Sequence, residues 1–121
     1  MKRILIVDDD KAILEILQEF LQLQGHAVCI AEKTLDALML FGKNKIDLVI
    51  SDFQIDERNG FDLSKKILEI DPNVPIIVMS GNIDSKTESK LLNIGVRYVL
   101  SKPVRLSELR GYIKLCFLPD P

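Results

Sequence analysis

The stretch Ile4-Leu5-Ile6-Val7-Asp8-Asp9-Asp10 (ILIVDDD, residues 4–10) decides the fold, because four apolar residues run directly into three carboxylates. A continuous apolar run of this length is typical of a strand buried on both faces, as in a parallel sheet. Charges placed immediately after the run predict a polar rim at the carboxyl end of that strand. The same order of an apolar run followed by polar residues recurs along the chain.

Four more apolar runs of strand length lie at residues 27–30, 48–50, 76–79 and 98–100. The segments between them have the apolar spacing of helices. The residues that carry this spacing are Ile13, Ile16, Leu17 and Phe20; Leu38 and Phe41; Leu63, Ile67 and Ile70; and Leu106, Leu109, Ile113 and Cys116. A fourth helix, roughly Ser85 to Asn93, has apolar residues only near its end and is expected to bury little surface. Gly25, Gly42 and Gly95 are predicted stops for the first, second and fourth helices.

Five alternations of strand and helix predict one α/β domain over residues 1–121. It is a doubly wound (βα)5 unit, with a parallel five-stranded sheet between two layers of helices. The usual strand order for such a chain is 2-1-3-4-5, the flavodoxin-like order, which we take from other folds of this kind.

Composition supports one globular domain and excludes several function classes. The chain has 121 residues, of which 47% are hydrophobic and 28% charged, with a formal net charge of −2. It therefore has no basic field for direct nucleic-acid binding. We expect no membrane partner, because no apolar run approaches the ~18 residues needed to cross a bilayer. Two distant cysteines and the absence of a signal-peptide pattern predict a cytosolic protein with core thiols.

The polar residues with chemical potential follow the strands. Asp8 and Asp9 follow the first, Asp52 the third, Ser80 the fourth and Lys102 the fifth. The carboxyl ends of strands in an open α/β sheet line one crevice, where ligands bind at the reversal of strand order. We therefore expect the three aspartates to converge, with Ser80 and Lys102 beside them.

Converging carboxylates repel one another and raise each other's pKa unless a positive charge lies among them. A hard divalent cation satisfies oxygen ligands of this kind, and Mg²⁺ suits a site with few carboxylates. A carboxylate can also attack phosphorus to give an aspartyl phosphate. Phosphoryl transfer needs mainly positioning and charge neutralisation, which metal, lysine and hydroxyl would supply here.

The chain resembles the receiver domains of response regulators in two-component signalling. The matching pieces are ILIVDDD at 4–10, DLVISD at 47–52, Gly60, VMSG at 78–81 and SKP at 101–103. Each piece alone is weak, but they occur in order and close to the end of each predicted strand except the second. The resemblance extends over essentially the whole chain.

The resemblance implies a phosphoacceptor switch and not a turnover enzyme. The implied roles are Asp52 as acceptor, Asp8, Asp9, Asp52 and the Gln54 carbonyl as Mg²⁺ ligands, Ser80 and Lys102 as phosphoryl contacts, and Lys102-Pro103 as a cis bond. The implied donor is a sensor histidine kinase or a phosphotransfer protein. A downstream effector or a fused output domain would read the surface formed by the fourth helix, fifth strand and fifth helix.

Three positions depart from the family pattern. Ile55-Asp56 stands where Met-Pro is usual, and Val104 stands where Phe is frequent. Val99 occupies the position of an aromatic residue that rotates on activation, and the adjacent Tyr98 should point to the opposite face of the sheet. These departures spare the chemistry but question the usual aromatic signalling step.

Simpler interpretations stand beside the functional ones. Asp10 is better explained as a helix cap, His26 as a loop histidine, and residues 56–58 as a solvated loop. Tyr98 is more often a packing residue than a switch. Three other functions stay open: a phosphohydrolase, although Gln54 replaces its usual second acid; a flavin or nucleotide binder, although glycine-rich phosphate loops are lacking; and a degenerate receiver acting as a scaffold.

Overall fold

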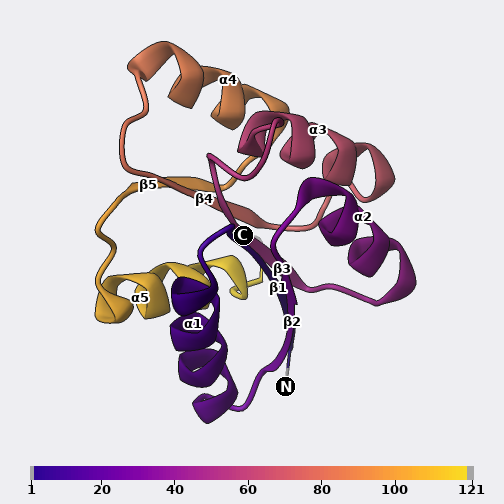
Figure 1. Cartoon of the computed structure of the whole chain (residues 1–121), viewed down its shortest axis with the longest axis vertical. Helices are drawn as coiled ribbons and strands as arrows, with labels where there is room; N and C mark the ends of the chain where they lie inside the picture. The colour runs from indigo at the N-terminus through magenta and orange to yellow at the C-terminus, as the bar shows by residue number, and fades with distance from the viewer. Residues whose placement is uncertain (1, 120–121) are drawn as a thin grey trace.

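The computed structural model describes residues 2–119, and residues 1, 120 and 121 lie outside its description. Five strands alternate with five helices (Figure 1). The strands are β1 (Arg3–Val7), β2 (Ala27–Ala31), β3 (Leu48–Asp52), β4 (Ile76–Ser80) and β5 (Tyr98–Ser101). The helices are α1 (Lys11–Leu23), α2 (Thr34–Lys43), α3 (Gly60–Ile70), α4 (Ser85–Ile94) and α5 (Leu106–Cys116). The predicted (βα)5 architecture is confirmed.

All neighbouring strands pair in parallel, and their order is β2-β1-β3-β4-β5. This is the expected 2-1-3-4-5 order. Residues 7 and 51 are register partners on β1 and β3, so the residues that follow them, Asp8 and Asp52, end adjacent strands. Strand order thus brings two of the predicted site residues together from 44 positions apart in the sequence.

Alternate residues of the sheet enter two separate hydrophobic cores. Leu5, Val49 and Val78 pack on the side covered by α2, α3 and α4. Their neighbours in sequence, such as Ile50 and Ile77, pack on the side covered by α1 and α5. Figure 1 shows these two helical layers on either side of the sheet. The three inner strands are buried on both faces as predicted, but the edge strands β2 and β5 are mostly half-exposed because each has one neighbour only.

Helix faces differ in detail from the predicted apolar stripes. Helix α1 buries Leu14, Leu17 and Leu21, whereas Ile16 is 56% exposed. An all-apolar run such as Ile13-Leu14 allows two overlapping stripes, and packing against the sheet selects the one shifted by one residue. In α2 the buried residues are Thr34, Ala37 and Phe41, and Leu38 is half-buried against the same core. In α3, Ile70 is exposed rather than buried.

The predicted helix stops hold at two of three glycines. Gly25 and Gly95 have φ angles of 91° and 117°, a left-handed conformation that glycine adopts without strain. Gly42 instead lies inside α2, which ends at Lys43. The bond Lys102-Pro103 is cis, as the resemblance implied. Within residues 2–119 no helix has both the length and the apolar character needed to cross a bilayer.

Candidate functional site

Three carboxylates meet at the carboxyl end of the sheet. Asp8, Asp9 and Asp52 each offer an oxygen, and these oxygens lie within 4.8 Å of one another. Asp8 comes from the loop after β1, and Asp52 is the last residue of β3. Asp8 and Asp52 are buried, whereas Asp9 is exposed. The predicted convergence is confirmed, and among the described residues this is the one group of metal-ligating side chains found.

Asp8 is the most enclosed of the three acids, with 1% of its surface exposed. Its Oδ1 accepts a hydrogen bond from the backbone N–H of Asp10 at 2.9 Å. Burial, with the nearby Asp52 carboxylate adding to it, raises the pKa of Asp8 above its ordinary value. The Asp10 N–H and the Lys102 ammonium act in the opposite direction but do not cancel the effect of burial.

Lys102 supplies the positive charge among the acids. Its Nζ lies 3.2 Å from Asp52 Oδ2 and 3.5 Å from Asp8 Oδ2. Burial acts to lower the pKa of Lys102, but the two carboxylates outweigh it and hold that pKa above its usual range. Lys102 is therefore charged at neutral pH, and one ammonium faces three carboxyl groups. That imbalance favours a further cation.

Ser80 closes the neighbouring strand, β4. Backbone hydrogen bonds tie this strand end to the ends of β3 and β5, from Phe53 N to Met79 O and from Lys102 N to Ser80 O, both at 2.8 Å. Ser80 is 3% exposed, and its hydroxyl oxygen accepts a hydrogen bond from Asn82 N at 3.3 Å. Next to it, a Cβ built on Gly81 would meet no protein atom within 4 Å. The structure places Ser80 beside the acceptor strand, with open space at the following residue.

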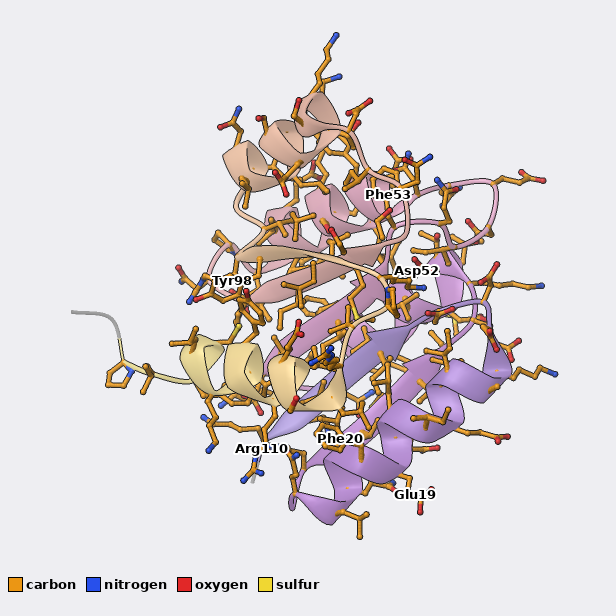
Figure 2. All side chains as sticks on the ribbon, turned by 90° about the vertical axis from the view of Figure 1, so that its left-hand side faces the viewer. Glu19, Phe20, Asp52, Phe53, Tyr98 and Arg110 are labelled. Atoms are coloured by element: carbon orange, nitrogen blue, oxygen red, sulfur yellow. The ribbon has the colours of Figure 1, made fainter. Side chains whose placement is uncertain are left out.

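The loop after Asp52 folds back on itself before α3 begins. Gln54 pairs with Asn59 in an antiparallel bridge, and Gly60 N donates to Phe53 O at 2.6 Å. Asn59 Oδ1 caps α3 by accepting from Phe61 N and Asp62 N. The Gln54 side chain is exposed. Figure 2 shows Asp52 and Phe53 where β3 passes into this loop.

Of the simpler interpretations, those for Asp10 and His26 hold and that for residues 56–58 is incomplete. Asp10 caps α1 by accepting from Ala12 N at 2.9 Å. His26 lies between α1 and β2, where its ring is 5.9 Å from that of Phe117. Residues 56–58 are exposed, yet Asp56 accepts two hydrogen bonds from Thr34 at the start of α2. Sequence reasoning missed this contact because its partners are 22 residues apart and no local pattern links them.

Tyr98 and Val99 pack on opposite sides of the sheet, as strand alternation predicts. Val99 contacts the core under α2, α3 and α4, whereas Tyr98 contacts the core under α1 and α5. The rings of Tyr98 and Tyr112 lie 4.9 Å apart. Figure 2 shows Tyr98 and Asp52 at opposite ends of the sheet. Tyr98 is therefore a packing residue in this structure and does not take the place of an aromatic group at position 99.

The donor set fits a hard cation. Carboxylate oxygens from three residues converge, no softer nitrogen or sulfur ligand joins them within the described chain, and one of the acids stays open to solvent. Oxygen ligands of this kind bind divalent cations of the magnesium and calcium type. The acidic triad is thus able to bind a metal ion, and a carboxylate beside a lysine could accept an electrophilic group.

Comparison with known proteins identifies relatives along nearly the whole chain. The family model for the response regulator receiver domain matches residues 4–114. The chain is 34% identical over 101 residues to the transcriptional regulatory protein GlrR of Escherichia coli, covering 84% of this chain and 23% of that protein. It is 40% identical over 112 residues to the two-component response regulator ARR10 of Arabidopsis thaliana, covering 90% and 20%. The chain therefore spans about a quarter or less of these relatives.

Solved structures agree in fold. A CheY-like response regulator receiver domain protein from Methanospirillum hungatei superposes with a TM-score of 0.92 at 30% identity, covering 95% of this chain and 92% of the other. The non-phosphorylated HemR receiver domain of Leptospira biflexa gives 0.91 at 28% identity, covering 100% and 98%. The match in sequence and the match in structure cover the same elements.

Proposed function

Because this chain belongs to the response regulator receiver domain family, we propose that Asp52 is the residue that receives the phosphoryl group. A receiver domain is a phosphoacceptor module of two-component signalling and not a turnover enzyme. The observation that carries the assignment is the Asp52 carboxylate at the end of β3, 7% exposed and 3.2 Å from the Lys102 ammonium. Asp8 and Asp52 are both buried, but only Asp52 lies at the end of β3, the strand that pairs with β4 and so with the strand that ends at Ser80.

We propose Mg²⁺ as the cation of the acidic triad. Asp8, Asp9 and Asp52 would hold it with the backbone carbonyl of Gln54, where the all-oxygen donor set supports the choice. When bound, the ion would neutralise charge on the phosphoryl oxygens. Asp8 also holds Lys102 in place, so that one residue serves both positive groups.

The transfer itself needs little covalent machinery. A carboxylate oxygen of Asp52 attacks phosphorus, the bond from phosphorus to the donor's imidazole nitrogen breaks, and the imidazole leaves with the bonding electron pair. Lys102 offsets the negative charge that gathers on the phosphoryl oxygens. The Ser80 hydroxyl donates a hydrogen bond to one of the phosphoryl oxygens once the group is attached. The buried position of Asp52 limits access of water to the acyl phosphate.

We propose a sensor histidine kinase or a phosphotransfer protein as the phosphoryl donor, in line with the relatives that are two-component response regulators. The negative charge added to Asp52 would attract the hydroxyl of Ser80, which lies at the end of β4 where the β4–α4 loop begins. The resulting movement would change the surface formed by α4, β5 and α5. A downstream effector or a fused output domain would bind that surface. A cytosolic location fits the free Cys29 and Cys116.

The test uses acetyl phosphate with Mg²⁺ and intact-protein mass spectrometry. We expect one phosphoryl adduct on the wild-type protein, none on Asp52→Ala, and none after chelation of the metal. Asp10→Asn is the matched control, since Asp10 lies beside the triad but caps α1, and asparagine caps as well. An adduct that persists in Asp52→Ala would refute the assignment.

A further inference from the structure

Helix α2 begins without a capping side chain from its own segment. The residue before it is Lys33, which makes no side-chain cap hydrogen bond. The first N–H groups of a helix have no partner within the helix and need an acceptor from elsewhere. Asp56 provides one, because its Oδ2 accepts from Thr34 N at 3.0 Å and its Oδ1 accepts from Thr34 Oγ1 at 3.1 Å. A carboxylate at this end of α2 also suits the helix dipole.

Asp56 shapes its own loop with the same carboxylate. Its Oδ1 accepts from Arg58 N at 2.9 Å, and the preceding residue, Ile55, is 3% exposed and packs in the core under α2 and α3. Gln54 lies two residues before Asp56 and is paired with Asn59. The contact with Thr34 therefore anchors the outer side of the loop whose inner side begins at Asp52.

The start of α2 is attached to the acidic triad by a second path. Asp8 N donates to Ala31 O at 3.1 Å, and Ala31 lies three residues before Thr34. The first turn of α2 is thus joined to Asp8 through the end of β2 and to the Asp52 loop through Asp56. Thr34 is 1% exposed, so it cannot move far without opening the core.

We propose that Asp56 is a positioning residue for the metal-binding loop, and that its contact with Thr34 couples occupation of the acidic triad to the first turn of α2. This inference rests on the proposed function, since it takes Mg²⁺ to bind among the three acids and Gln54. Coupling of this kind is reciprocal. A metal ion that orders the loop also stabilises the start of α2, and loss of the contact weakens metal binding.

Two measurements on the metal alone test the coupling. Amide chemical shifts during a Mg²⁺ titration give the Kd, and hydrogen exchange of amides 34–37 is compared with and without Mg²⁺. In the wild-type protein we expect Mg²⁺ to slow this exchange. In Asp56→Ala we expect Mg²⁺ to have no such effect and the Kd to rise about fivefold, at the lower end of typical couplings. Asp56→Asn keeps an acceptor and should restore most of both.

Asp84→Ala is the matched control, because the Asp84 carboxylate likewise caps a helix, accepting from Thr87 N at the start of α4, but lies in another loop than Asp56. It should leave the Kd for Mg²⁺ unchanged. Should Asp56→Ala fail to fold, Thr34→Val removes one donor from the same contact at almost constant volume and is expected to raise the Kd about twofold.

The outcomes separate this inference from the proposed function. A wild-type protein that neither binds Mg²⁺ at the triad nor forms an Asp52 adduct overturns both. A wild-type protein that does both, with an unchanged Kd in Asp56→Ala and equal fraying of α2 with and without Mg²⁺, overturns the inference alone. In that case Asp56 is a structural cap only.

Discussion

The two loops that border the site, residues 52–60 and residues 80–84, differ in how firmly contacts with the rest of the protein fix them. The acidic half, residues 52–60, is closed by the Gly60 N to Phe53 O bond and by the Asp56 contact with α2. The hydroxyl half, residues 80–84, leads into α4, which buries Leu91 alone, whereas α3 buries four residues. The acceptor side is therefore held more firmly than the Ser80 side before any ligand arrives. The Ser80 side is free to follow a newly attached group, which is what a switch requires.

The largest expected effect comes from adding one methyl group to the rigid half. In Gly60→Ala the new Cβ would lie 3.0 Å from Phe53 Cα and 3.1 Å from Asp52 O, both backbone atoms. The loop cannot give way as a flexible side chain would, so we expect a loss of about 1–3 kcal/mol in the free energy of unfolding. Urea denaturation measures it, and slower phosphorylation should accompany it.

Gly81→Ala makes the same change in the other half and serves as its control. No protein atom lies within 4 Å of the added Cβ, so the free energy of unfolding should change by no more than about 0.5 kcal/mol. Equal losses in the two variants would remove the contrast between the halves.

A smaller effect should follow from removing one charge of the triad. In Asp52→Asn the remaining acids lose a buried neighbour of like charge, and Lys102 keeps its contact with Asp8. Without divalent cations we expect the variant to be more stable than the wild-type protein by about 1 kcal/mol, since the Asp52 carboxylate adds to the cost of burying the charge of Asp8. With Mg²⁺ the wild-type protein should gain stability and the variant much less. Thermal unfolding under both conditions tests this, and a less stable metal-free variant would contradict it.

The smallest effect concerns the cap of α4. The pKa of Asp84 is lowered, chiefly because Thr87 N donates to its carboxylate at 2.7 Å. A depressed folded-state pKa contributes stability above the unfolded value, near 3.8, and that contribution is lost as the pH falls through the folded value. Hydrogen exchange should therefore show α4 fraying in strong acid while the α3 amides stay protected. Asp84→Asn keeps a cap that does not titrate, so its α4 should not share this pH dependence.

The fold was predictable because each level of the sequence agrees with it. Ile4 to Val7 is apolar without a break, as a central parallel strand must be, and the carboxylates that follow lie where such strands open to a ligand. The site residues could be assembled for the same reason, since parallel strands align their carboxyl ends without further information. Even Val99 and Tyr98 were placed correctly by alternation alone.

What escaped prediction depends on contacts between distant segments. The choice between Leu14 and Ile16 for burial is set by how α1 rests on the sheet, because both residues suit a helix equally well. The capping of α2 by Asp56 needs the β3–α3 loop to lie against Thr34, and neither segment carries a local sign of the other. Such contacts follow from packing, and periodicity within one segment does not encode them.

The tyrosine pair has a practical consequence. The chain has no tryptophan and two tyrosines, and the two tyrosine rings lie against each other between β5 and α5. Intrinsic fluorescence of the unlabelled protein therefore originates at one place, away from the acids but on the elements through which the signal is proposed to leave. Tyrosine fluorescence therefore reports on the proposed output surface, with no dye and no added chromophore.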